Sequence, residues 1–217
     1  MRQILLALII GLALSGPVYA QDDMSTVRKA AEQGDADAQF QLGLLYAEGQ
    51  VVPKDGKAAV KWYRMAAEQG NVYAQFNLGL MYDFGQGIPQ DAQKAARWYQ
   101  MAAEQGDSKA QNNLGVLHEH GRGVPKNDQE AVKWYQMAAE QGNNGAQNNL
   151  GILYEKGQGV PQDPVRAYMW FILAALQDDG GAAARNRDAV AQHLTPAETL
   201  QALVMARNWQ RSKATPP

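Results

Sequence analysis

The stretch AQFNLGLMYDFGQGIPQDAQKAARWYQMAAEQG, residues 74–106, decides the fold, because most of it recurs along the chain. The recurring tryptophans stand 36 residues apart, at Trp62, Trp98, Trp134 and Trp170. A fixed period of this length is typical of stacked supersecondary units that cannot bury their apolar faces alone. Stacked helical repeats present a long binding surface rather than one closed catalytic pocket.

Each unit reads as two antiparallel helices joined by a short loop. In residues 35–70, Asp35 can cap a first helix that ends at Gly49, a residue suited to a left-handed C-terminal stop. After a loop that contains Pro53, Asp55 can cap a second helix. Apolar residues recur at helical spacing in both segments. The sequence therefore predicts an all-α fold built from helix pairs.

Two sets of recurring residues are expected to form the core of the repeats. Glycine in the middle of a helix costs about 1 kcal/mol relative to alanine. Its recurrence therefore indicates that two helix backbones approach closely, at Gly43, Gly79, Gly115 and Gly151. The four tryptophans are expected to supply large buried area between helices.

The unit A-x-x-x-L-G-x-x-Y-x-x-G-x-G-[VI]-P-x-D-x-x-x-A-x-x-W-Y-x-x-A-A-x-x-G resembles the Sel1-like repeat, a relative of the tetratricopeptide repeat. Two positions depart from it: Val51 replaces the second loop glycine of the first unit, and His118 replaces a tyrosine. The resemblance implies a right-handed α/α solenoid of antiparallel helix pairs. It also implies that the first helices line a concave face used for protein interaction.

The first twenty residues are typical of a cleaved secretory signal. Arg2 precedes an apolar run at residues 4–14, and small residues follow up to Ala20, after which we expect cleavage. The run of 11 residues is short of the roughly 20 that span a bilayer, so we expect no stable membrane insertion after cleavage. The mature protein is predicted to lie in a bacterial periplasm or outside the cell.

The expected organisation has five parts. They are a signal peptide at residues 1–20, an N-terminal capping helix at 21–34, four repeat units at 35–174, C-terminal capping helices at 175–211 and a disordered tail at 212–217. Thr195 and Glu198 have the spacing of a capping box that opens the last helix. Such end segments cover the apolar face that a terminal repeat would expose.

Composition and local motifs disfavour nucleic-acid binding, metal binding and catalysis. The formal net charge of −2 does not suit a phosphate backbone, and the lack of cysteine excludes disulfides and thiolate sites. The G-x-G triplets follow helices and lack a Lys-Ser/Thr partner, so they indicate turns and not phosphate loops. His118 and His120 point to different sides of a helix. With no Ser-His-Asp arrangement and no dinucleotide fingerprint, we predict no enzyme, no cofactor and no metal.

The variable positions of the first helices predict a binding surface. In the first unit these positions are Asp37, Phe40, Leu44, Ala47 and Glu48, and their counterparts recur in each later unit. Aromatic residues gather toward the N-terminal end of the array, and clusters of this kind tend to mark interaction sites. The candidate partner-binding residues are Phe40, Tyr73, Phe76, Leu80, Asp83, Phe84, Lys109, Asn112, His120, Asn148 and Lys156.

We therefore predict an exported, non-catalytic scaffold or adaptor that binds a peptide segment or helix of a partner protein on the concave face. One alternative is that Phe40 and Phe76 pack between neighbouring units instead of facing a partner. Another is a binder of glycan or peptidoglycan fragments that uses the amide-rich half of the array, with Asn112, Asn113, Asn148 and Asn149. A third is a hydrolase built on the solenoid, which would need a clustered, partly buried acid–base pair.

Overall fold

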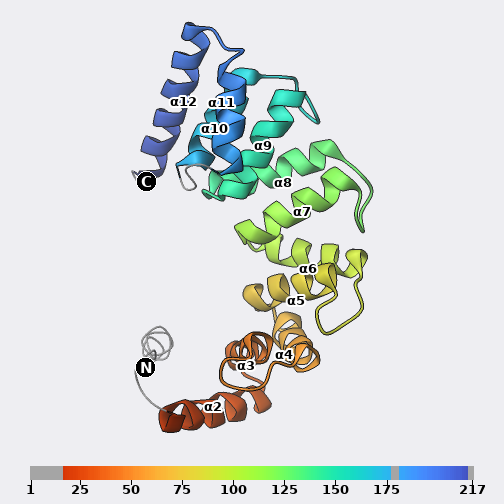
Figure 1. Ribbon diagram of the computed structural model, residues 1–217. Helices are drawn as coiled ribbons and strands as arrows, with labels where there is room; N and C mark the ends of the chain where they lie inside the picture. The colour runs from red at the N-terminus through yellow and green to blue at the C-terminus, as the bar shows by residue number, and fades with distance from the viewer. Residues whose placement is uncertain (1–16, 177–180, 215–217) are drawn as a thin grey trace.

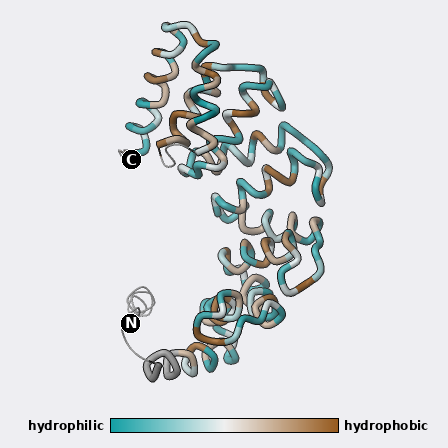
Figure 2. Tube along the Cα trace, viewed as in Figure 1, coloured by the Kyte–Doolittle hydropathy of each residue, from teal (hydrophilic) through white to brown (hydrophobic). Residues whose placement is uncertain are grey.

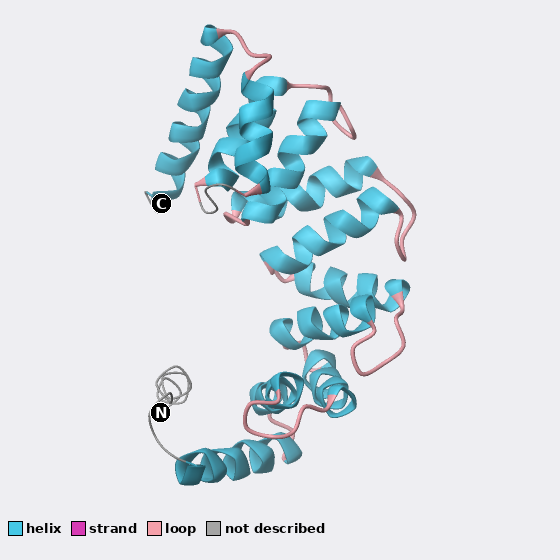
Figure 3. Cartoon of the chain, viewed as in Figure 1, coloured by secondary structure: helices cyan, strands magenta, loops and turns pink. Residues whose placement is uncertain are grey.

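The computed structural model describes residues 17–176 and 181–214, and this described part holds helices and loops but no strand (Figures 1 and 3). The first helices of the four units are α3 (Ala36–Glu48), α5 (Val72–Phe84), α7 (Ser108–His120) and α9 (Asn144–Lys156). The second helices are α4 (Gly56–Glu68), α6 (Ala92–Glu104), α8 (Asp128–Glu140) and α10 (Pro164–Ala175). The array is preceded by α2 (Pro17–Glu32) and followed by α11 (Ala182–Ala191) and α12 (Pro196–Ala214).

The helices stack on one another in chain order. Each packs against the next from α2 to α11, and α12 packs on α10. Figure 1 shows the result as one curved array with α2 at one end and α12 at the other. Figure 2 shows hydrophilic and hydrophobic residues interspersed along the helices, as expected for helices that bury one side against their neighbours. In the described part, no helix combines the length and the apolar character that crossing a bilayer requires.

The helix ends follow the predicted signals. Asp35 Oδ1 accepts a hydrogen bond from Ala38 N at 2.8 Å. The helix that Asp35 opens, α3, ends at Gly49, whose φ of 74° lies in the left-handed region that favours glycine. The predicted capping box is confirmed, because Thr195 Oγ1 accepts from Glu198 N at 3.3 Å and Glu198 Oε2 accepts from Thr195 N at 2.8 Å.

The two ends of the chain differ in detail from the expected boundaries. Helix α2 begins at Pro17 and continues past Ala20, while the rest of the expected signal peptide lies outside the described residues. Helix α12 continues to Ala214, so the expectation of disorder is wrong for residues 212–214. Ser212 Oγ donates to the carbonyl of Trp209 at 2.7 Å in this last turn. Residues 215–217 lie outside the described part.

One packing contact recurs in every unit and joins its two helices. A Cβ atom placed on Gly79 would lie 2.6 Å from Cδ1 of Tyr99, closer than nonbonded carbon atoms approach. The same relation joins the other central glycines to second-helix rings, in the pairs Gly43–Tyr63, Gly115–Tyr135 and Gly151–Phe171. The expectation that these glycines admit a neighbouring backbone is therefore wrong. They admit an aromatic side chain.

The ring in this contact belongs to the residue that follows the tryptophan. Those residues, Tyr63, Tyr99, Tyr135 and Phe171, are the largest fully buried side chains. Trp134 and Trp170 are also buried, whereas Trp62 and Trp98 are half-buried. The Nζ of Lys133 lies 5.4 Å from the centroid of the Trp134 ring. Two of the four tryptophans thus belong to the buried core and two lie at its margin, whereas the rings that follow them are buried in all four units.

Buried glutamines link successive units. Gln75 is 1% exposed, donates from Nε2 to the Ala67 carbonyl at 3.1 Å and accepts from Gln105 Nε2 at 2.7 Å. The same arrangement joins Gln39 to Gln69 and Gln111 to Gln141. Leaving a buried polar group unpaired costs about 1–3 kcal/mol, so Gln75 depends on Gln105 of its own hairpin and on the Ala67 carbonyl of the preceding one. The sequence analysis did not single out these residues, although each follows the alanine of the repeat motif.

We expect Gly79→Ala to lower the free energy of unfolding by about 1–3 kcal/mol, because the new methyl group would overlap the Tyr99 ring. The matched control is Gly145→Ala in α9, where the nearest atom to an added Cβ is 3.4 Å away. Alanine should favour the helix there and stabilise by up to about 1 kcal/mol. Urea unfolding followed by circular dichroism measures both changes. Unchanged or increased stability of the Gly79 variant would contradict this packing.

Candidate interaction surface

Two aromatic side chains on α5 are exposed. Tyr73 and Phe84 have exposed fractions of 63% and 64%. They lie 11 residues apart, which is about three helical turns, so they project from the same side of the helix. The opposite side of α5 is buried against its neighbours through residues such as Ala74 and Leu78. The two rings therefore occupy the side of α5 that the rest of the described chain leaves uncovered.

The other predicted aromatic residues pack within the array. The ring centroid of Phe40 is 5.9 Å from that of Tyr63 and 5.8 Å from that of Tyr73. The Phe76 ring is 6.0 Å from Tyr99. Phe40 and Phe76, like Leu80, are half-buried against the core. Phe40 therefore packs between units through Tyr73, in line with the alternative raised from the sequence, whereas the ring contact of Phe76 lies within its own hairpin.

Asp83 is also an internal residue and not an open contact for a partner. Its side chain is buried, and its Oδ1 lies 3.4 Å from Nη1 of Arg122 as an ion pair without hydrogen-bond geometry. The Tyr99 hydroxyl donates to Asp83 Oδ2 at 3.5 Å. Burial, and next the Asp83 charge, raise the pKa of Tyr99 above its usual value. Asp83 therefore offers little surface to a partner, because its carboxylate is buried, and these contacts offset the cost of burying its charge.

The amides of the C-terminal half are engaged between units. Asn112 Oδ1 accepts from Asn149 Nδ2 at 3.2 Å, which joins α7 to α9. Asn148 Oδ1 accepts from Asn186 Nδ2 at 2.9 Å, which joins α9 to α11. Both predicted residues are half-buried. These contacts occupy hydrogen-bonding groups that a glycan would need.

The predicted basic residues of the surface are open to solvent. Lys109, His120 and Lys156 are exposed. None of the ion pairs among the described residues includes either lysine. His118 is half-buried, unlike His120, so the two imidazoles sit in different surroundings. Across residues 17–176 and 181–214, no group of three His, Asp or Glu side chains is placed to hold a metal ion.

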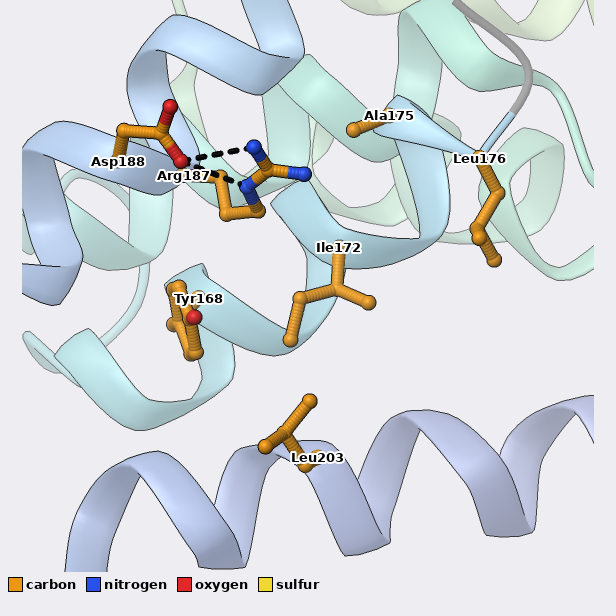
Figure 4. A pocket seen from close by; sticks show the side chains of 7 residues that line it. All are labelled: Tyr168, Ile172, Ala175, Leu176, Arg187, Asp188 and Leu203. Atoms are coloured by element: carbon orange, nitrogen blue, oxygen red, sulfur yellow. Dashed lines mark hydrogen bonds and ion pairs between the residues drawn. The ribbon is translucent and has the colours of Figure 1, made fainter. Parts of the chain in front are cut away.

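A cleft of about 570 Å³ lies at the other end of the array, between α10, α11 and α12. Figure 4 shows its wall of apolar side chains and the Arg187–Asp188 pair beside it, with Nε of Arg187 donating to Asp188 Oδ1 at 2.8 Å. The lining residues are Tyr168, Ile172, Ala175, Leu176, Arg187, Asp188 and Leu203.

The sequence analysis missed this cleft, although α10 carries a signal for it. Ile172 and Leu176 stand where the preceding unit has Gln136 and Glu140. The last second helix is thus apolar on a side that is polar in the earlier units. Helix α12 packs on α10 there, with the Trp170 and Trp209 rings edge to face at 6.1 Å.

Comparison with known families and structures identifies the repeat. Sel1 repeats match residues 36–71, 72–107, 108–143 and 145–179. The Sel1 repeat protein from Oxalobacter formigenes is 42% identical, with a TM-score of 0.69 over 76% of this chain and 67% of that one.

A second solved structure is c5321, a protective antigen of uropathogenic Escherichia coli strains that displays an SLR fold. It is 32% identical with a TM-score of 0.58 over 86% of this chain and 48% of that one, so this chain spans about half its length. The comparison with curated proteins gave no match. Because the four repeats cover more than half of its residues, the chain belongs to the Sel1 repeat family, whose members are α/α solenoids that generally serve as protein-interaction scaffolds.

Proposed function

We propose that this protein is an exported, non-catalytic scaffold that binds a segment of a partner protein on the exposed side of its first helices, centred on α5. The observation that carries the proposal is the exposure of Tyr73 and Phe84, at 63% and 64%. Their neighbours Phe40 and Phe76 are packed against the core, so exposure is not a general property of the aromatic residues here.

The energetics favour a binding role for these two rings. Fully burying a large apolar side chain contributes about 1.5–3 kcal/mol relative to leaving it in water. Within the described chain each ring gains only part of that contribution, because more than half of its surface stays exposed. Aromatic residues dominate the binding energy of many interfaces, and a partner that covers both rings would recover this free energy. Membership of the Sel1 repeat family supports the same class of function.

The non-catalytic part of the proposal rests on the use of the acidic residues. Asp83 is paired with Arg122, and Glu119 Oε2 accepts from the Tyr135 hydroxyl at 2.7 Å. These carboxylates hold helices together instead of forming an acid–base pair around a substrate. Export to the periplasm or the cell exterior is proposed from the signal-like pattern of residues 1–20.

A photo-crosslinking amino acid placed at Tyr73 or at Phe84 in cells that produce the protein should capture the same partner from both positions. The matched control is the same substitution at Met101 in α6, which is 41% exposed on a second helix. We expect no such adduct from Met101. Equal capture from all three positions, or none from α5, would sink the proposal.

The structural and binding roles of the aromatic residues can be separated by two substitutions. Phe76→Ala should lower the free energy of unfolding by about 2 kcal/mol, less than the 3–5 kcal/mol typical of a fully buried phenylalanine. Phe84→Ala should leave stability within about 0.5 kcal/mol, yet reduce the adduct formed by the crosslinker at Tyr73. Thermal unfolding and adduct yield are the two readouts. Loss of folding in the Phe84 variant would show that its ring belongs to the core.

A further inference from the structure

The exposed side of the first helices consists of three parallel rows of residues. In the first unit the three positions are Asp37, Leu44 and Glu48, which are separated by seven and then four residues, and the same positions recur 36 residues later in each following unit. This spacing makes them project from one side of a helix. The first row is Asp37, Tyr73, Lys109 and Gly145; the central row is Leu44, Leu80, Val116 and Ile152; the third row is Glu48, Phe84, His120 and Lys156.

Burial separates the three rows clearly. Every residue of the two outer rows is exposed, and every residue of the central row is half-buried. The central row is apolar throughout. Side chains also bridge neighbouring first helices at two places, where Phe40 of α3 contacts Tyr73 of α5 and Asn112 of α7 bonds to Asn149 of α9. The face is therefore an apolar strip flanked by two exposed rims.

Both rims change in the same order along the array. Each begins with a carboxylate on α3, continues with an aromatic ring on α5 and reaches a basic side chain on α7, as in Asp37, Tyr73 and Lys109. Helices α3 and α5 contain no lysine, arginine or histidine. The two rims are therefore acidic at their N-terminal end and carry basic side chains toward their C-terminal end, while Glu119 and Glu155 beside the third row are half-buried.

The rim charges are not neutralised within the described chain. Its ion pairs do not include Asp37, Glu48, Lys109 or Lys156. Asp37 accepts a hydrogen bond from the neutral amide of Asn71 at 2.9 Å, which leaves its charge in place. At the far end, Ile152 packs against the cluster of Ala167, Phe171 and Val190, and α9 also meets α11.

Resting on the function proposed above, we propose that this face binds an amphipathic protein segment whose charge is polarised along its length. The apolar side chains of the segment lie along the central row, between Tyr73 and Phe84. Its basic side chains lie over α3, opposite Asp37 and Glu48, and its acidic side chains lie over α7 and α9, opposite Lys109 and Lys156. A uniformly basic or uniformly acidic segment would meet like charge at one end.

Fluorescence anisotropy with designed peptides tests this inference on the full chain. Four labelled helical peptides of about 20 residues, roughly 30 Å long, share one leucine stripe and differ only at their ends. The polarised peptide has glutamates at one end and lysines at the other. The two uniform peptides have lysines at both ends or glutamates at both ends, and the neutral peptide has glutamines at both ends. We expect the polarised peptide to bind about 3–10-fold more tightly than the glutamine peptide and than either uniform peptide. In about 0.5 M salt this preference should largely disappear, because exposed charges are screened.

A charge-reversal variant identifies the rim as the source of the preference. Asp37→Lys with Glu48→Lys should weaken the polarised peptide about 3–10-fold and strengthen the peptide with glutamate at both ends. Glu68→Lys with Glu104→Lys makes the same charge change on exposed residues of second helices and should leave the order of affinities unchanged.

The possible results separate this inference from the proposed function. If all four peptides bind equally and Phe84→Ala weakens them, the proposed docking on α5 stands and the polarity inference is wrong. If the control variant shifts affinities as much as the rim variant, net charge and not the rim explains them, and the inference is also wrong. If no peptide binds, the docking proposal and the polarity inference both fall.

Discussion

The contact between a central glycine of each first helix and a buried ring of the second sets how closely the two helices of a hairpin pack. The Tyr99 ring reaches the backbone of α5 because Gly79 has no side chain. A glycine inside a helix costs about 1 kcal/mol, and the burial of a whole aromatic side chain offsets it. Because this contact recurs in all four units, the hairpins have the same internal geometry and can stack with a constant period.

The stacking between hairpins depends on a different kind of contact. Alanines such as Ala67 and Ala103 are fully buried where consecutive helices meet, and the paired glutamines cross the same region. These glutamines donate to backbone carbonyls in the last turn of the preceding second helix. Packing and hydrogen bonding thus restrict which residues can stand at the buried positions of every unit. The exposed positions of the first helices are not restricted in this way.

Freedom from packing explains the character of the first-helix surface. Its two rims can carry acidic, aromatic or basic side chains without changing the core. Its central row remains apolar because these residues are half-buried against the core. The two ends of the array have different requirements. Helix α10 has an apolar outer side because α12 covers part of it, and Leu176 remains 62% exposed at the edge of the resulting cleft.

The sequence by itself determined the all-α class, the helix pairs, the caps and the repeat period, because these depend on local propensity and on spacing that recurs. It also placed Tyr73 and Phe84 on the candidate surface. Only the tertiary structure decided which candidate residues are free. Phe40, Phe76 and Asp83 occupy variable positions like those of the exposed residues, but they contact Tyr63, Tyr99 and Arg122 respectively, which lie 23 or more residues away along the chain. Exposure depends on which distant side chains fill the neighbouring space, and helical periodicity specifies only the direction in which a residue points.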